Sequence, residues 1–225
     1  FQIFLHFFNV GIDLIDKVRF VLGQGGFRLT KFVVNEDSVL QNIPEADRAN
    51  EIKDLKSDIK TKALGIKWDV KLDAFYFEVH LDSVENVTKR YILSTVSSMF
   101  DPLGLINPVL VTGKLLFQEA TRLKLDWDDT IPHRLCMKWN NWLQSLQGIQ
   151  GLLIDRCVKP VNFNDAYVEL HLFSDASEKA YGCCCYVRCI NKEGQIIVSL
   201  LTSRCKVAPL KTVSIPRLEL QAAVM

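Results

Sequence analysis

The sequence predicts a protein of the α+β class, because blocks of strands and blocks of helices follow one another along the chain. Two runs of alternating apolar residues, at 63–70 and 74–81, predict a β-hairpin. Three apolar stripes at helical spacing between residues 89 and 146 predict a small helical bundle. Near the C-terminus, three strand-like runs, at 167–175, 180–189 and 196–205, precede a final helix.

Length and composition are those of a soluble globular protein. The 225 residues suffice for one large domain or two small ones, and 48% of them are apolar and 24% charged. A net charge of +1 gives no overall attraction to nucleic acid, so any such binding must rest on local sites. Seven cysteines without a recognisable signal peptide favour reduced thiols inside a cell. The apolar start FQIFLHFFNV is too short and too polar to span a membrane.

The residues before the hairpin predict a helix, a strand and a charged segment. A helical stripe runs from Ile12 to Leu22, and the glycine pair at 25–26 ends it. The run FRLTKFVVN, residues 27–35, predicts a strand. Residues 42–62 carry many charges and few apolar anchors, so they form an exposed helix or a charged loop.

The bundle is predicted from three helices with short connections. The first runs from Lys89 to Phe100, a DPLG turn follows at 101–104, and Pro108 fits the first turn of the second helix. The third helix runs from about Pro132 to Leu146. Its start could be capped by Asp128, Asp129 or Thr130. The apolar stripes of the three helices are Ile92, Val96, Met99 and Phe100; Val109, Leu116, Phe117, Ala120 and Leu123; and Leu135, Trp139, Trp142, Leu143 and Leu146.

Two acids stand out in the C-terminal block. Asp175 closes the first strand-like run, and Glu219 follows 44 residues later in the helix that Ser214 and Pro216 open. A three-strand meander between them leads the chain back to the first strand, so the two carboxylates can meet. A solvent-facing Glu219 is the alternative. The cysteines at 183–185 point to alternate faces of a strand and lack zinc-binding spacing, so they are interpreted as small buried residues.

Several literal strings resemble one family. FSDAS (173–177), AYG (180–182), KVAPLK (206–211) and IPRLELQAA (215–223) are similar to the Pol polyprotein of BEL/Pao-type LTR retrotransposons, in the region of the Pao retrotransposon peptidase family. Residues 90–120 share this resemblance, and GGFRLTKFVVN and LGIKW are similar to the end of a reverse transcriptase. We therefore interpret the chain, from Phe1 to Met225, as a fragment of such a polyprotein.

The resemblance implies three regions. Residues 1–87 would be the C-terminal part of a reverse-transcriptase palm, residues 88–159 a helical thumb or connection, and residues 160–225 the truncated N-terminal half of an RNase H-like domain. It also implies intracellular localisation, in the cytoplasm, a virus-like particle or the nucleus. The partners would be an RNA:DNA hybrid or a template-primer and the remainder of the Pol polyprotein, with no membrane.

The implied chemistry is phosphodiester hydrolysis by two metal ions. Asp175 and Glu219 would be catalytic and would supply part of the ligand shell of Mg²⁺, while further acids come from a later strand and helix of the family. Two acids alone should bind Mg²⁺ poorly. Weaker candidates for contacts with nucleic acid are Gly65 and Trp68 in the hairpin and Lys206, Lys211 and Arg217 around the acids, although a buried Trp68 and ordinary surface cations are equally compatible with the sequence.

Three functional hypotheses remain open at this stage. The first is the reverse transcriptase and RNase H lineage, although the Tyr-x-Asp-Asp turn needed for polymerisation is missing from these residues. The second is an aspartic peptidase, although no Asp-Ser-Gly or Asp-Thr-Gly turn occurs and Asp101 fits a turn or helix cap better. The third is a degenerate remnant without enzymatic activity. The sequence leaves open whether the chain by itself is an enzyme.

Overall fold

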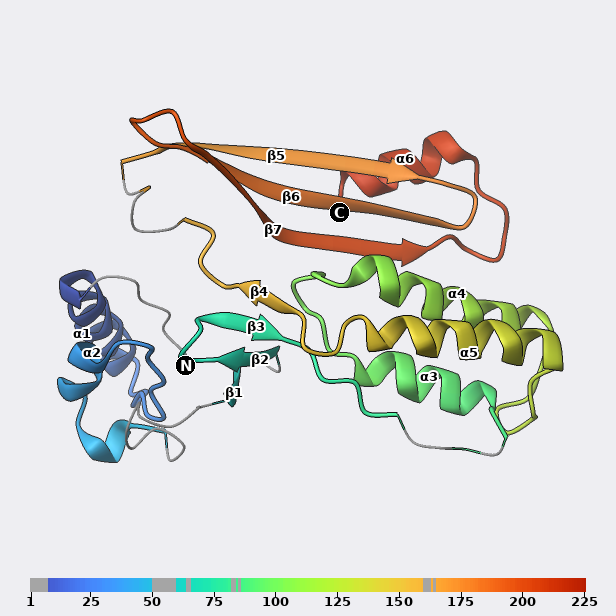
Figure 1. Cartoon of the computed structure of the whole chain (residues 1–225), viewed down its shortest axis with the longest axis horizontal. Helices are drawn as coiled ribbons and strands as arrows, with labels where there is room; N and C mark the ends of the chain where they lie inside the picture. Colours follow the sequence, from blue (N-terminus) through green and yellow to red (C-terminus); the bar gives the residue numbers. More distant parts are fainter. Residues whose placement is uncertain are drawn as a thin grey trace. The chain divides into compact units, whose positions relative to one another are not determined.

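The structure is a computed structural model that describes residues 8–49, 60–63, 66–81, 84, 86–159, 163 and 165–225 (Figure 1). The chain forms two compact units. The first comprises Phe1–Tyr76 and Leu153–Cys157, and the second comprises Phe77–Leu152 and Val158–Met225. Segments 88–159 and 160–225 therefore belong to one unit, except for the short return to the first unit at 153–157.

The first unit begins with a helix that ends as its sequence predicts. In α1 (Phe8–Gln24), the Phe27 amide donates to the carbonyl of Leu22 and the Gly26 amide donates to that of Gly23. This pair of bonds is the Schellman motif, and Gly26 supplies the positive φ of 77° that the motif requires. The other elements are α2 (Asp37–Gln41), the 3₁₀ turn Glu45–Asp47, β1 (Lys60–Ala63), β2 (Ile66–Asp69), β3 (Ala74–Tyr76) and β4 (Leu153–Asp155).

The strand predicted for residues 27–35 is wrong. Only Phe32 forms an isolated bridge, to Arg48, within this segment. Lys31 has a φ of 59°, which turns the chain out of an extended conformation just before Phe32. Phe32, Val33 and Val34 are all buried, so this run does not alternate between two faces as a half-buried strand would.

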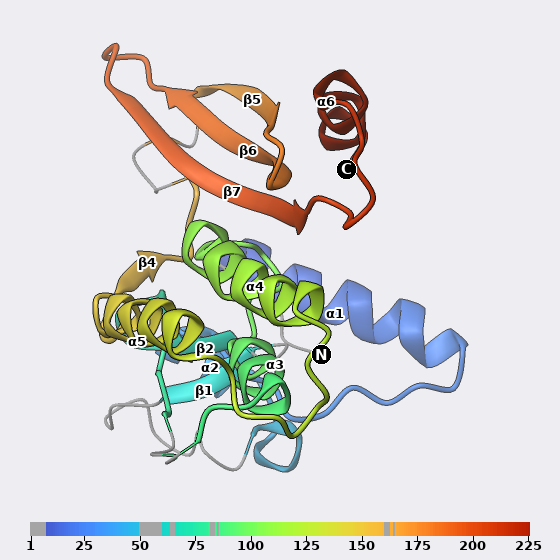
Figure 2. The same ribbon diagram turned by 90° about the vertical axis from the view of Figure 1, so that its right-hand side faces the viewer.

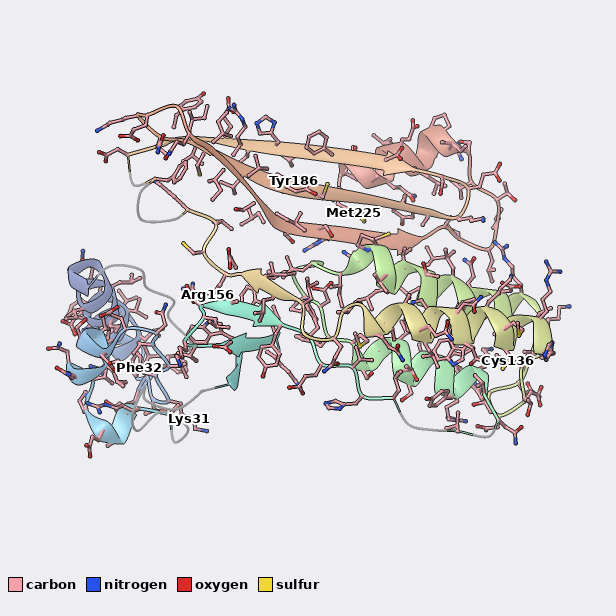
Figure 3. All side chains as sticks on the ribbon, viewed as in Figure 1. Lys31, Phe32, Cys136, Arg156, Tyr186 and Met225 are labelled. Atoms are coloured by element: carbon pink, nitrogen blue, oxygen red, sulfur yellow. The ribbon has the colours of Figure 1, made fainter. Side chains whose placement is uncertain are left out.

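The predicted hairpin is present, and a distant segment completes its sheet. The strands β1, β2, β3 and β4 pair in this order, each antiparallel to the next. Arg156, which directly follows β4, donates to both carboxylate oxygens of Asp73 in the β2–β3 turn, with Nη2 at 2.7 Å from Oδ2. The Trp68 indole Nε1 donates to the same carboxylate at 3.1 Å. Both charged side chains are mostly buried, so this ion pair fixes β4 to the hairpin. Figure 3 shows Arg156 beside the strands of this sheet.

The three predicted helices are confirmed in the second unit, as α3 (Lys89–Ser98), α4 (Asn107–Arg122) and α5 (His133–Gln147). The Thr88 side chain caps α3 by accepting from the Tyr91 amide at 3.2 Å. The cap predicted for α5 is wrong, because Pro132 is the N-cap and offers no side-chain acceptor. Asp128 instead forms a bidentate ion pair with Arg90, which lowers the pKa of the Asp128 carboxyl.

The predicted C-terminal meander is also confirmed. Strands β5 (Tyr167–Ala176), β6 (Ala180–Ile190) and β7 (Ile196–Val207) form an antiparallel sheet in sequence order, followed by α6 (Ile215–Ala223). The turn between β6 and β7 contains Gly194 with a φ of 78°, and Asn191 and Gln195 bond to each other across it. A register shift at Cys185/Tyr186 bends the β6–β7 pair.

Helices contact this sheet at two places. Figure 2 shows α6 beside β5 and β6, where Leu218 and Ala222 are buried, and α4 next to β7. The turn before α4 is bonded to β7, because the Ser203 amide donates to the Leu103 carbonyl at 2.8 Å. Over the described ranges, no helix is long and apolar enough to cross a membrane.

Candidate functional site

Asp175 lies at the second-last position of β5, as predicted. The sheet register places it opposite Gly182 of β6, which in turn faces Cys205 of β7. Directly paired residues of adjacent strands share one face of a sheet, so these three residues form a row across it. A β-carbon at Gly182 would lie 2.8 Å from the Arg204 carbonyl oxygen of β7, so the close approach of these strands beside the exposed Asp175 requires glycine.

A shallow groove follows this row. Its volume is about 360 Å³. A second row of paired residues, Phe173, Cys184 and Ser203, continues its floor, and Asn107 and Pro108 at the start of α4 border it. The Asn107 side-chain amide donates to the Ser203 hydroxyl at 2.9 Å, and this hydroxyl donates to the Gly104 carbonyl at 2.5 Å. The helical bundle therefore closes one end of the groove that contains Asp175.

Glu219 lies in α6, the helix that packs on β5 and β6. Its neighbour Leu218 is buried against the sheet, whereas the Glu219 side chain is exposed. The fold thus brings the strand of Asp175 and the helix of Glu219 together. Glu219 is not among the residues that line the groove, so the meeting of the two carboxylates at one ion stays a prediction.

The donor set fits magnesium in kind. Mg²⁺ prefers oxygen ligands and is often held by one or two carboxylates together with water and substrate phosphates. Asp175 and Glu219 offer such oxygens and are both open to solvent. Within the described residues, no group of three or more His, Cys, Asp or Glu side chains could hold a metal ion. These two acids would therefore supply only part of a ligand shell.

The weaker nucleic-acid candidates divide into three cases. Trp68 was interpreted either as a contact to nucleic acid or as a buried residue. It is 0% exposed, so the structure shows a buried residue. Gly65 lies outside the described residues. Lys206, Lys211 and Arg217 are exposed, with Lys206 on β7, Arg217 on α6 and Lys211 between them.

The cysteines of β6 and β7 do not form a metal site in the described part of the chain. The Cys183, Cys184, Cys185 and Cys205 thiols are free. Burial raises the pKa of the Cys184 thiol, and the neighbouring thiols raise it further. Burial also raises the pKa of Cys205, against the opposing effect of Lys114. Raised pKa values keep the Cys184 and Cys205 thiols protonated at neutral pH. Cys183, Cys184 and Cys185 are half-buried, so their interpretation as fully buried residues is wrong.

Asp101 has a structural role. Its two carboxylate oxygens accept hydrogen bonds from the Leu105 and Ile106 amides at 2.9 and 2.8 Å, just before α4. This is the turn-forming role expected from the DPLG motif. A carboxylate that is occupied in this way does not resemble one of the two acids that share a proton in an aspartic peptidase.

Asn107 and Ser203 were missed by the sequence analysis. They are 96 residues apart and meet only because the turn before α4 is bonded to β7. Each residue alone is typical of a helix start or a strand, so no local signal links them to Asp175.

The order of these elements, an antiparallel three-stranded meander followed by a helix packed on its first two strands, is that of an α+β domain of the RNase H-like class. The family described as "Pao retrotransposon-like RNaseH-like domain" matches residues 88–225, which is more than half of the chain. The chain belongs to this family, which supports the resemblance to the Pol polyprotein of BEL/Pao-type retrotransposons. No curated protein sequence matches the chain.

Proposed function

We propose that residues 160–225 contribute to a nuclease that hydrolyses the RNA strand of an RNA:DNA hybrid. The observation that carries this proposal is the position of Asp175 at the end of β5, with α6, the helix that contains Glu219, packed on the same strand. The family match over residues 88–225 supports the same class of domain. Nuclease sites of this kind use carboxylates on neighbouring elements to bind divalent metal ions.

Each acid has one role in this proposal. Asp175 and Glu219 would supply oxygen ligands to Mg²⁺, and both side chains are exposed. Bound Mg²⁺ supplies an activated water and stabilises the leaving oxygen. The groove of about 360 Å³ that Asp175 lines leaves room for a phosphate group.

The exposed cations near the acids favour a nucleic-acid substrate. Lys206, Lys211 and Arg217 lie on β7, on the following loop and on α6, and the first of these is paired in register with Tyr181 of β6. Such side chains contact phosphates without reading sequence, which suits an enzyme that must act along a whole hybrid. We propose that they position the backbone rather than take part in hydrolysis.

The two acids are an incomplete set, so activity requires further ligands. We propose that the 225 residues by themselves do not cleave hybrid, and that additional acids of the Pol polyprotein complete the site. Residues 1–87 are proposed to derive from a reverse-transcriptase palm, on the resemblance of GGFRLTKFVVN and LGIKW. In this lineage the hybrid is the product of RNA-directed DNA synthesis.

The test is magnesium-dependent cleavage of a labelled RNA:DNA hybrid. The 225-residue chain should give no cleavage, whereas a Pol chain extended along the same reading frame should cleave. In the extended chain, Asp175→Asn and Glu219→Gln should each lower the rate by a factor of about 100 or more, because each removes a metal ligand. Asp128→Asn, which alters an exposed ion pair of the bundle, is the matched control and should leave the rate unchanged.

Two results would overturn the proposal. One is undiminished cleavage by the extended chain after either acid has been replaced. The other is an equal loss in the Asp128→Asn control, which would mean that the losses report folding instead of metal binding. Binding of Mn²⁺, followed by its effect on water proton relaxation, gives a readout that does not depend on turnover.

A further inference from the structure

A cleft lies between α4 and the segment that joins β7 to α6. Its volume is about 780 Å³, and it shares no lining residue with the groove of Asp175. Helix α4 forms one wall with Gln118 and Arg122, and residues 208–215 form the loop wall opposite. The β5–β6 turn adds Glu178 and Lys179. Three segments that are distant in the sequence therefore meet at this cleft.

Hydrogen bonds join the three segments. The Gln118 side-chain amide donates to the Ala208 carbonyl at 2.6 Å, and the Ala208 amide donates to the Lys179 carbonyl at 2.8 Å. Ala208 itself is buried. The Ser177 hydroxyl accepts from the Lys179 amide at 3.3 Å and fixes the turn. The frame that holds Lys179 opposite α4 is thus formed by described residues of one compact unit.

The lining of the cleft carries more available cations than available acids. Glu119 pairs with Lys138 at 2.7 Å, so these two charges compensate each other. The other charged lining residues are Arg122, Lys179 and Glu178, and all three are exposed. Among the described residues, neither Arg122 nor Lys179 has an ion-pair partner. Both cations are therefore free to meet an anion.

The loop wall adds a further cation and two hydroxyl groups. The exposed Lys211 lies between the lining residues Leu210 and Thr212. Ser214 also lines the cleft, and within the described part of the chain its hydroxyl makes no capping bond to α6. Lysine, arginine and hydroxyl side chains are among the usual contacts of phosphate oxygens. The loop wall therefore suits the same anion as the cations opposite.

A polar stripe on α4 leads from the cleft towards the row of Asp175. Lys114, Gln118 and Arg122 are spaced by four residues, so they lie along one side of the helix. Gln118 turns this side towards the loop wall. Burial raises the pKa of the Cys205 thiol, and Lys114 opposes this effect, so Lys114 lies near Cys205. Cys205 belongs to the row that contains Asp175.

The spacing of these charges suits a chain of phosphates better than a single phosphate ion. Lys114 and Arg122 are eight residues apart, which is about 12 Å along the helix axis. This length corresponds to about three to four nucleotides at a rise of about 3.4 Å per strand. One phosphate ion could reach only one end of the stripe, whereas a strand of nucleic acid could follow it.

We propose that one strand of the RNA:DNA hybrid crosses the cleft between α4 and residues 208–215, with its phosphates bound by Lys114, Arg122 and Lys179. The identity of the nucleic acid rests on the proposed function. The inference assigns part of the substrate binding to α4, which precedes residues 160–225. The helical bundle and the C-terminal sheet thus hold one substrate together.

Fluorescence anisotropy of a labelled RNA:DNA hybrid with the 225-residue chain tests the inference, in EDTA and over a series of salt concentrations. EDTA removes divalent metal ions, so the measured binding does not require the metal ligands Asp175 and Glu219. Arg122→Gln and Lys179→Gln should each weaken binding by a factor of about 8 at about 0.1 M salt, because each removes one phosphate contact. Each should also lower the slope of log affinity against log salt by about 1. Arg122→Lys keeps the charge and should keep the slope.

Lys192→Gln is the matched control. It also removes one positive charge, from an exposed ion pair with Asp165 in the β6–β7 turn. The eleven residues of β6 separate this turn from Lys179, a distance of roughly 36 Å. Because charges are screened beyond about 10 Å at 0.1 M salt, the control should bind the hybrid as the unmodified chain does. Circular dichroism checks that all variants are folded.

Four results would overturn the inference without touching the nuclease proposal. They are an unmodified chain that does not bind the hybrid, unchanged binding by Arg122→Gln and Lys179→Gln, an equal loss in Lys192→Gln, and displacement of the hybrid by inorganic phosphate at constant ionic strength. The last would mean that the cleft takes a free phosphate ion. Charge-dependent binding together with an extended chain that fails to cleave would support the inference and contradict the nuclease proposal alone.

Discussion

Gly104 illustrates how one residue joins two parts of the second unit. It ends the DPLG turn with a φ of 74°. The Ser203 carbonyl group occupies the space into which a side chain at this position would project. A β-carbon at this position would collide with that carbonyl oxygen and with the Asn107 side chain. The close approach of Gly104 to Ser203 also lets Asn107 bond to Ser203 at the end of the groove. The glycine is therefore required both for the turn and for the site.

We expect Gly104→Ala to lower the free energy of unfolding by about 3 kcal/mol or more, because left-handed strain and a backbone collision act together. Gly194→Ala is the matched control. Gly194 also has a positive φ, 78°, but no atom of the described part of the chain lies within 4 Å of the added β-carbon. This variant should lose only about 1 kcal/mol. Urea titrations of both variants measure the difference, and equal losses would contradict the role of the collision.

Single residues were predicted unevenly from the sequence. The positions of Asp175 and Asp101 follow local rules, since a strand end and a DPLG turn are short-range features. Alternation alone could not decide whether Trp68 is buried. Its indole donates to Asp73, and Asp73 is held by Arg156, which lies 83 residues further along the chain. The Asn107–Ser203 contact depends in the same way on tertiary structure.

At the scale of elements, α5 contributes two tryptophans to the bundle core with different hydrogen bonding. Trp139 and Trp142 are both buried, and their rings lie 4.8 Å apart. The Trp142 Nε1 donates to the Val109 carbonyl of α4 at 2.9 Å. Among the residues that the structure describes, the Trp139 Nε1 has no hydrogen-bond partner. Gly113 of α4 leaves the space that the Trp142 ring fills.

Trp142→Phe should therefore destabilise the chain more than Trp139→Phe. Both changes remove a similar volume from the core, but only the first also removes a hydrogen bond and leaves the Val109 carbonyl without it. The expected difference in the free energy of unfolding is about 1–2 kcal/mol. Chemical denaturation followed by far-ultraviolet circular dichroism measures it. If Trp139→Phe were the more damaging change, packing of the ring would outweigh hydrogen bonding at this position.

Elements with a strong period were predicted well. The strands β5, β6 and β7 and the helices α3, α4 and α5 lie where alternation and helical stripes place them, to within a few residues. The failure at residues 27–35 has a local cause, the left-handed conformation of Lys31. Strand β4 is only three residues long and pairs with β3 far upstream, so its sequence carries no recognisable period.

At the scale of the whole molecule, the path of the chain differs from a simple succession of domains. The chain leaves the first unit after Tyr76, builds α3, α4 and α5, returns for Leu153–Cys157, and then enters the C-terminal sheet. The family match begins at residue 88 and so includes β4, whose partner β3 lies upstream of it. The sequence could not show that the chain returns to the first unit at Leu153–Cys157, because so short a segment leaves no change in composition at its ends.

This chain path predicts how a shortened chain behaves. A chain of residues 77–225 contains both sheet and bundle of the second unit but lacks β3 and Asp73, the partners of β4 and Arg156. We expect its α4, α5 and β6 amides to remain protected from hydrogen exchange, because their partners are all retained. The amides of Leu153–Asp155, in contrast, should lose protection by a factor of about 100 or more relative to the full chain, since their cross-strand bonds are gone. Hydrogen–deuterium exchange with mass spectrometry compares the two chains. Loss of protection in β6 as well would mean that the second unit needs the first in order to fold.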